Sequence, residues 1–411
     1  KEIWKKNEGK IMNILYVANL IPYPLDGGGK IFTYSTIQAL GKQNDVDLVC
    51  LYEHEDIKAG KQVLLKHCSS IETIPIRVTT RENMTLMMIK AFQSFFSHLP
   101  LGVSKYIVPE MKAMIRKKMI TKKYDRVFFN ILSMFGYYEF IKNIDPEIKT
   151  VLYEQNCESL IYKRYFNQTN NILKKIFLKI ETEKLTKFEQ KAVNKTEHLI
   201  MLSDEDRREV GVPVEKCSII PVGIMPTDYH KFYKPEEKGR LKMLFIGTMT
   251  WMPNNHGIIW FLENVMPLCN DISKYELFIV GKNPSERVRK LSENYDNVHL
   301  MGYVESLDSI YDECDIVIVP LFIGSGQRVK IIEAFSRGHA IISTSIGVEG
   351  LQYENNKTIL IADDACQFKT QIDRCFNRNL LKTIGEGGKN IFDTEYSTNV
   401  ITKKINAAIQ L

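Results

Sequence analysis

The sequence has no apolar run close to the roughly 20 residues that a membrane-spanning helix requires. Its first residues, KEIWKKNEGKIMNILYVANL, join a charged leader to an apolar run that is too short to cross a bilayer. The eight cysteines form no CxxC pair and no metal-ligand spacing with histidine, which disfavours a disulfide scaffold and a zinc site. We therefore expect a reduced, cytoplasmic protein that is soluble or peripheral to a membrane.

Other familiar patterns are also missing. The glycines at 27–29 do not form GxGxxG, so the sequence carries no dinucleotide fingerprint. No nucleic-acid-binding motif accompanies the basic residues, which disfavours a nucleic-acid partner. No Asp-x-Asp is tied to a glycine loop, and the pair Asp363 and Asp364 is typical of a helix cap rather than a metal site.

The length and the order of segments predict two α/β domains. The 411 residues exceed the roughly 250–300 at which a single core stops growing. Strand-like and helix-like segments alternate in both halves, which is typical of two Rossmann-like, doubly wound domains facing across a cleft. We expect an N-terminal domain at 11–222, an irregular proline-containing linker at 223–238, a second domain at 239–390, and a C-terminal helix at 391–411 that packs back on the first domain.

Positive charge is concentrated in the first half. Residues 1–222 contain 34 Lys and Arg and 26 Asp and Glu, whereas the remaining residues contain 21 Lys and Arg and 23 Asp and Glu. The excess lies in 105–126 and in 163–195, the latter expected as part of one long helix ending near Asn194. Such helices suit an anionic membrane surface or a lipid-phosphate acceptor, and they equally suit a solvated helix face.

The most informative segment is 315–351. Its sequence predicts a buried strand, a glycine loop, a helix, a second strand and a second glycine loop. The first loop contains Gly324, Ser325 and Gly326 directly before the helix. Backbone N–H groups of such a loop and the N-terminus of the following helix favour an anion such as a diphosphate.

Three charged side chains follow this loop. Arg328 and Lys330 fall in the first turn of the expected helix, and Glu333 follows about one turn later. Two cations beside one carboxylate can bind a diphosphate and a diol together, and a nucleotide sugar presents both groups. An exposed basic helix start is the alternative, but cations there oppose the helix dipole.

In the first half, polar side chains follow an expected strand at 150–156. Glu154, Gln155, Asn156 and Glu158 lie at its carboxyl end, where open α/β sheets make ligand contacts. The glycines at 27–29 follow the first strand and allow another molecule to approach the backbone.

These motifs together resemble the retaining, nucleotide-sugar-dependent glycosyltransferases of family four, which have the GT-B fold. The resemblance covers nearly the whole chain and is strongest in the second half. It rests on GGG followed by a helix, PVGI at 221–224, FIGTM at 245–249, GYVES at 302–306 and IIEAFSRGHAIISTSIGVEGL at 331–351. The last three are similar to a subgroup that makes cell-surface polysaccharides.

The resemblance implies roles for individual residues. Glu333 matches the second glutamate of the family's paired-glutamate motif, which binds the donor ribose, and Ser325 stands where the family has the first glutamate. Arg328 and Lys330 are then the candidates to neutralise the diphosphate. The remaining donor and acceptor positions are Gly247 and Thr248 at the diphosphate turn, Tyr303 and Val304 at the nucleobase, Gly28 and Gly29 in the N-terminal loop, and Asn156 and Glu158 in the acceptor domain.

One departure affects the mechanism. Gln155 occupies the position of a family histidine near the donor sugar, and an amide can hydrogen-bond but cannot transfer a proton. The resemblance implies a metal-independent enzyme without cofactor that moves a sugar from a nucleoside diphosphate to a saccharide or lipid-linked saccharide with retention. A catalytically degenerate scaffold protein and a sugar-nucleotide epimerase of the same fold remain alternatives. A periplasmic binding protein is disfavoured by the reduced cysteines and the missing signal peptide.

Overall fold

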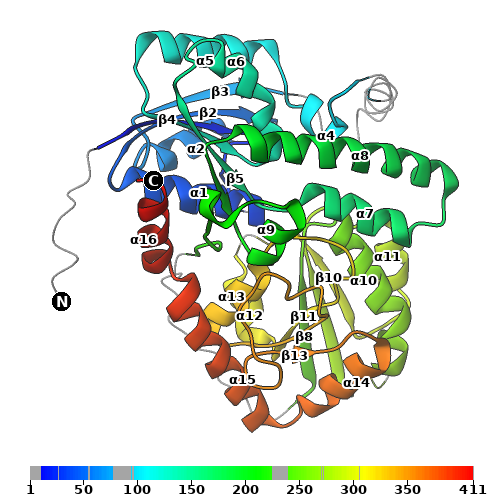
Figure 1. The fold of residues 1–411 in the computed structure, drawn as a ribbon. Coiled ribbons are helices and arrows are strands. Elements are labelled where there is room, and N and C mark those ends of the chain that lie inside the picture. The colour runs from blue at the N-terminus through cyan, green and yellow to red at the C-terminus, as the bar shows by residue number, and fades with distance from the viewer. Residues whose placement is uncertain are drawn as a thin grey trace. The chain divides into compact units, whose positions relative to one another are not determined.

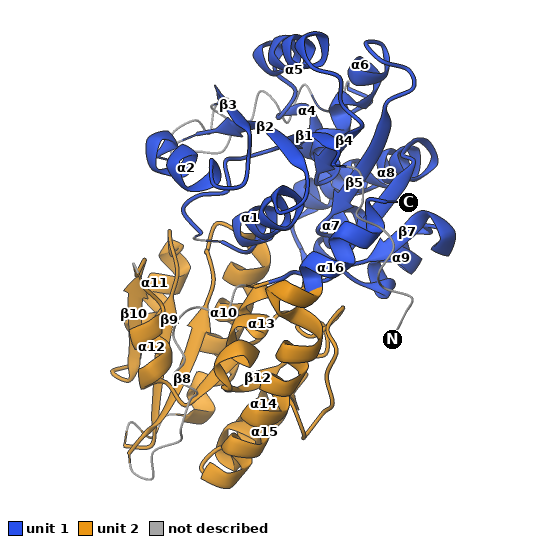
Figure 2. Cartoon of the chain, turned by 90° about the vertical axis from the view of Figure 1, so that its left-hand side faces the viewer, with its two compact units in different colours: residues 1–223, 401–411 blue, residues 224–400 orange. Residues whose placement is uncertain are grey.

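The computed structural model describes residues 11–25, 27–53, 56–76, 94, 97–224, 239–269, 271, 273–304 and 306–410 (Figure 1). The chain divides into two compact units, residues 1–223 with 401–411 and residues 224–400 (Figure 2). Apart from residues 223 and 224, the predicted linker lies outside the described residues. The predicted C-terminal helix is divided between the units, since its last residues group with the first unit.

The first unit is built on a seven-stranded parallel sheet. The strand order is β3-β2-β1-β4-β5-β6-β7. The five central strands are largely apolar and buried, as a parallel sheet covered by helices requires, whereas the two edge strands are more exposed. The strands are β1 (Asn13–Ala18), β2 (Asp45–Tyr52), β3 (Ser70–Pro75), β4 (Arg126–Asn130), β5 (Lys149–Glu154), β6 (His198–Met201) and β7 (Cys217–Ile219).

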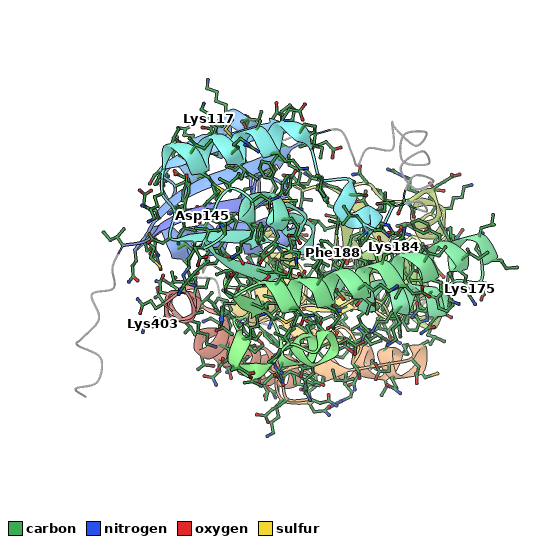
Figure 3. The ribbon with its side chains drawn as sticks, turned by 45° about the horizontal axis from the view of Figure 1, so that its top comes forward. Lys117, Asp145, Lys175, Lys184, Phe188 and Lys403 are labelled. Carbon is green, nitrogen blue, oxygen red and sulfur yellow. The ribbon has the colours of Figure 1, made fainter. Side chains whose placement is uncertain are left out.

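Helices connect these strands. They are α1 (Gly28–Gly41), α2 (Ile57–Leu64), α4 (Leu101–Ser104), α5 (Pro109–Thr121), α6 (Tyr138–Lys142), α7 (Glu158–Gln168), α8 (Ile172–Lys195) and α9 (Asp204–Val210), with 3-10 turns at Leu132–Tyr137 and Val214–Lys216. The prediction of one long basic helix up to Asn194 is wrong. Two helices form because Asn171 caps α8 by accepting a hydrogen bond from the Lys174 backbone N–H at 3.0 Å. Lys184 and Phe188 lie along α8 (Figure 3).

The second unit has a six-stranded parallel sheet in the order β10-β9-β8-β11-β12-β13. Its strands are β8 (Leu241–Ile246), β9 (Tyr275–Val280), β10 (Val298–Gly302), β11 (Ile316–Val319), β12 (Ala340–Ser343) and β13 (Leu360–Ile361). Its helices are α10 (Met252–Asn264), α11 (Glu286–Ser292), α12 (Asp308–Glu313), α13 (Val329–Arg337), α14 (Ala365–Arg374) and α15 (Arg378–Ile391), with a 3-10 turn at Met266–Cys269. A π-helical turn at Phe392–Tyr396 leads from α15 to α16 (Thr398–Ala408).

Two alternating α/β units with parallel sheets confirm the predicted fold class. Asp364 caps α14 by accepting from the Gln367 N–H, as the sequence predicted. All eight cysteines are free thiols. Among the described residues, no helix has both the length and the apolar character needed to cross a bilayer.

Candidate functional site

In the second unit the strand order reverses between β8 and β11. The chain runs from β8 outward to β9 and β10, and then returns to place β11 on the other side of β8. Open α/β sheets bind ligands beside the carboxyl ends of strands at such a switch point. Two loops follow the strands there, Gly247–Trp251 after β8 and Pro320–Arg328 after β11. Both contain residues that the sequence analysis selected.

The loop after β11 depends on glycine. Gly324 has φ 134° and Gly326 has φ 73°, a region that L side chains rarely adopt. Arg328, the residue before α13, is 3% exposed and donates hydrogen bonds to the carbonyls of Ser325 and Gly326. A further contact at 3.4 Å reaches the Ile346 carbonyl. The guanidinium that we expected at the diphosphate therefore also holds the loop in shape.

Lys330 lies in the first turn of α13 and is half-buried. Its ammonium donates to Asn254 Oδ1 at 2.9 Å and lies 4.7 Å from the centre of the Phe245 ring. Burial, and secondarily the neighbouring Arg328, lower the pKa of Lys330 to about 7. An added anion at this point would stabilise the ammonium form.

Asn254 joins the loop after β8 to α13, a role that the sequence analysis missed. It lies in α10, is 5% exposed, and donates from Nδ2 to the Thr248 carbonyl at 3.1 Å. A Cβ at Gly247 would lie 2.6 Å from the Asn254 side chain, so glycine is needed in this turn. Asn255 and His256 follow Asn254 in the helix, so no pattern in the sequence marked Asn254 as the buried one.

Glu333 lies three residues after Lys330, on the same side of α13. Burial raises the pKa of Glu333 to about 7, against the opposing effect of the Arg337 and Lys330 cations. Arg337 itself donates to Asp308 Oδ1 at 2.5 Å. The helix thus carries one amine and one carboxyl that are both close to titration at neutral pH.

Tyr303 borders a pocket of about 380 Å³ at the ends of β9 and β10. The Tyr303 side chain is 53% exposed, and the Lys282 ammonium lies 4.2 Å from the centre of its ring. Backbone bonds join this region to the β8 turn: Met249 N–H donates to the Lys282 carbonyl at 3.0 Å, and Gly281 N–H to the Gly302 carbonyl at 2.7 Å. The predicted residues Tyr303 and Gly247 are therefore on connected loops, with Val304 next in the chain.

In the first unit the predicted acceptor residues converge from two elements. Gly28 and Gly29 begin α1, and a Cβ at Gly29 would lie 3.3 Å from Gln155 Oε1, just beyond β5. Asn156 follows, and Glu158 is the first residue of α7. Burial raises the pKa of Glu158 above its ordinary value.

Asn130 was missed by the sequence analysis, although it ends β4 at the switch point beside β1. It accepts from the Tyr16 hydroxyl at 3.0 Å and donates to Thr33 Oγ1 at 2.9 Å. The next residue, Ile131, has φ 68°, which is an outlier for a β-branched side chain. Strain of this kind concentrates at functional sites, and no feature of the sequence announces it.

Among the described residues, no group of three or more His, Cys, Asp or Glu side chains is arranged to hold a metal ion. Lys330 and Glu333 lie on α13, directly after the loop at the switch point, and Arg328 is hydrogen-bonded to carbonyls of that loop.

Comparison with known proteins extends this picture. Residues 240–378 match the glycosyl transferases group 1 family. A Klebsiella pneumoniae protein, described as an uncharacterized 44.6 kDa protein in cps region, is 30% identical over 372 residues, which cover 87% of this chain and 89% of that protein.

Solved structures share the fold over nearly the full length. HepE of Anabaena, crystallised with UDP and glucose, is similar with a TM-score of 0.67 at 13% identity, covering 97% of this chain and 99% of that chain. Sucrose-phosphate synthase of Thermosynechococcus elongatus gives a TM-score of 0.69 at 17% identity, covering 97% and 98%. At these identities the likeness shows the GT-B fold alone. The family match lies within the second unit, so residues 240–378 are the part of the chain identified as similar to the glycosyl transferases group 1 family.

Proposed function

We propose that the protein transfers a sugar from a nucleoside diphosphate sugar to a hydroxyl of a saccharide or lipid-linked saccharide, with retention of anomeric configuration. The observation that carries the proposal is the pairing of Lys330 and Glu333 on α13, beside the glycine loop at the switch point. A cation and a carboxylate about one helical turn apart suit a diphosphate and the diol of its ribose.

The pocket beside Tyr303 supports a place for the nucleobase. Backbone bonds connect it to the turn after β8, and Asn254 connects that turn to Lys330. An exposed aromatic ring can stack on a base, and the adjacent Lys282 adds a donor. The related folds of HepE, crystallised with UDP-glucose, and of TarM, crystallised with UDP, agree with such a donor.

The chemistry asked of the protein is mainly electrostatic. As the glycosidic bond breaks, negative charge develops on the diphosphate, and Lys330, the N–H groups at the start of α13 and the loop N–H groups would stabilise it. The leaving phosphate can accept the proton of the attacking hydroxyl on the same face of the sugar. Gln155 would then orient the sugar by hydrogen bonds only, so no imidazole base is required.

One relative supports the setting. The Klebsiella pneumoniae relative is described as lying in the cps region, which favours a role in polysaccharide synthesis. The chain would act in the cytoplasm, without a metal ion, on an acceptor held by Gly28, Gly29, Asn156 and Glu158 in the first unit.

A thermal-shift panel of UDP-, GDP-, ADP- and dTDP-sugars tests donor binding, because a bound ligand raises the melting temperature by mass action. The donor that shifts it is then incubated alone and with saccharide or lipid-linked saccharide acceptors, and the product anomer is assigned by NMR. Transfer with retention is expected. If every donor leaves the melting temperature unchanged, the proposal is wrong.

A catalytically inactive scaffold is a second candidate, because the buried Arg328 guanidinium is engaged with loop carbonyls and Gln155 cannot transfer a proton. It predicts donor binding without hydrolysis or transfer. An epimerase predicts an isomerised sugar nucleotide when the donor is incubated alone.

A further inference from the structure

The start of α8 exposes three large apolar side chains. Ile172 is 73% exposed, Leu173 is 79% exposed and Ile176 is 52% exposed. Ile172 and Ile176 are one helical turn apart, on the side opposite to Leu178, which is 4% exposed. Isolated exposed apolar residues are ordinary, but three within five positions form a contiguous apolar surface.

Positive charge surrounds this surface. Residues 163–180, which we call the α7–α8 corner, contain five Lys and Arg and no Asp or Glu. Lys174 and Lys179 form no ion pair within the described part of the chain and are exposed. The Lys175 ammonium lies 5.7 Å from the centre of the Phe166 ring on α7. Figure 3 shows Lys175 at the end of α8 remote from Phe188.

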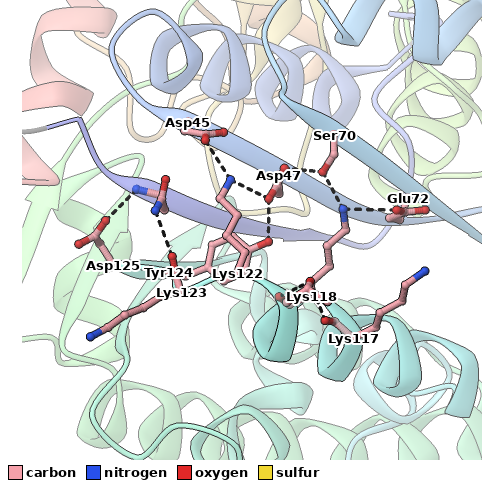
Figure 4. Close-up of polar contacts among 12 residues, drawn as sticks. Asp45, Asp47, Ser70, Glu72, Lys117, Lys118, Lys122, Lys123, Tyr124 and Asp125 are labelled. Atoms are coloured by element: carbon pink, nitrogen blue, oxygen red, sulfur yellow. Dashed lines mark hydrogen bonds and ion pairs between the residues drawn. The ribbon is translucent and has the colours of Figure 1, made fainter.

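Much of the remaining basic charge of the first unit is paired. On α5, Lys118 lies 3.3 Å from Glu72, and the adjacent Lys122 lies 2.9 Å from Asp47 (Figure 4). At the other end of α8, Lys195 lies 2.6 Å from Glu139. Within the α7–α8 corner, Lys163 lies 3.5 Å from Glu209. The corner differs from α5, where Ile120 is the strongly exposed aliphatic side chain, because three such side chains lie together in the corner beside Lys174 and Lys179.

We propose that the α7–α8 corner binds the surface of an anionic lipid bilayer. The aliphatic side chains of Ile172, Leu173 and Ile176 would enter the boundary between headgroups and acyl chains, while Lys174 and Lys179 bind lipid phosphates. Lysine suits this position because its stem can lie along apolar surface with the ammonium in the headgroup layer. The proposal goes beyond sugar transfer and does not rest on it.

The positive charge of the corner favours an anionic bilayer over a second copy of the chain as its binding partner. Two such corners meeting face to face would bring Lys174, Lys175 and Lys179 of one copy towards those of the other, and residues 163–180 contain no acid to offset the repulsion. An anionic bilayer supplies the opposite charge together with an apolar layer.

Vesicle flotation of the full chain tests the proposal. The protein is expected to float with phosphatidylcholine vesicles that contain phosphatidylglycerol and to remain behind with phosphatidylcholine alone. Lys174→Gln with Lys179→Gln should weaken binding by about 30-fold, from roughly fivefold for each cation near an anionic surface. Ile172→Ser with Ile176→Ser should weaken it by about tenfold or more.

Matched controls lie on α5. Ile120 is 71% exposed, so Ile120→Ser removes an equally exposed isoleucine, and Lys117→Gln removes a cation outside the corner. Both variants should bind vesicles as the unchanged protein does. Equal binding to both vesicle types, equal loss in the control variants, or a change from dimer to monomer in Ile172→Ser with Ile176→Ser would overturn the proposal.

The same variants separate this proposal from the transferase function. Donor binding, measured as the rise in melting temperature with the nucleotide sugar, should be unchanged in all of them because the corner belongs to the first unit and the donor residues to the second. Loss of vesicle binding with intact donor binding is the expected result. If the Ile172→Ser, Ile176→Ser protein still binds vesicles, the membrane role is refuted, whether or not that protein binds the nucleotide sugar.

Discussion

Replacing Lys330 with methionine isolates the charge that we assign to the donor diphosphate. Methionine keeps most of the side-chain volume and removes the ammonium that contacts Asn254 at 2.9 Å and lies over the Phe245 ring. A hydrogen bond to a charged group is worth about 2 kcal/mol, which corresponds to about a 30-fold loss in donor affinity.

The stability of the free protein should change much less. The lost bond to Asn254 costs about 1 kcal/mol, but the variant no longer holds a partly desolvated ammonium. The pKa of Lys330 falls from 10.5 to about 7 on folding, so protonation opposes folding. That cost is fully present below pH 7 and disappears as the pH rises towards 10.5. The relative stability of Lys330→Met should therefore be greatest below pH 7 and decrease in alkali.

Titration calorimetry with the nucleoside diphosphate that gives the largest thermal shift measures the affinity. In the unchanged protein, affinity should fall by up to tenfold per pH unit above about pH 7, because the anion binds the protonated amine. Lys330→Met should lack this alkaline decline. Lys242→Met is the matched control, since Lys242 also lies over a ring, that of Phe278 at 5.8 Å, but is at the opposite end of β8 from the turn.

Wild-type affinity in Lys330→Met, or an alkaline decline that survives the substitution, would show that the ammonium does not contact the diphosphate. An equal loss of donor affinity in Lys242→Met would show that the loss comes from removing any positive charge from the second unit, not from removing a contact with the diphosphate.

Three further predictions concern the same site. Glu333→Gln should weaken donor binding about tenfold and abolish the fall in affinity below about pH 7, where the Glu333 carboxyl becomes protonated, as calorimetry across pH would show. Arg328→Lys should lower the free energy of unfolding by about 2–3 kcal/mol in urea, since the carbonyls of Ser325 and Gly326 lose their shared donor; unchanged stability would contradict the loop-holding role. Gly326→Ala, at φ 73°, should cost about 1–2 kcal/mol in the same assay, whereas Gly102→Ala, at a helical position with open space, should not.

Several features of the structure were not predicted from the sequence. The break between α7 and α8 was not foreseen because one capping bond at Asn171, rather than apolar periodicity, decides it. The buried roles of Arg328 and Asn254 were also missed, because a side chain's choice between ligand and backbone carbonyl depends on loop geometry. Ile131 in a left-handed conformation has no counterpart in any local preference.

What the sequence determined by itself is the architecture. Alternating apolar strands and amphipathic helices admit few arrangements other than parallel α/β units, and glycines at 324 and 326 mark the loop because no other residue accepts that backbone freely. Only the tertiary structure decided which basic side chains are free of ion pairs and can bind an anionic surface. Pairing with Glu72, Asp47 and Glu139 neutralises lysines that look equivalent in the sequence, and Lys163 of the α7–α8 corner likewise lies 3.5 Å from Glu209. Lys174 and Lys179 of the corner form no ion pair within the described chain. Ion pairing is a contact between residues distant in sequence, so its outcome follows from packing rather than from composition.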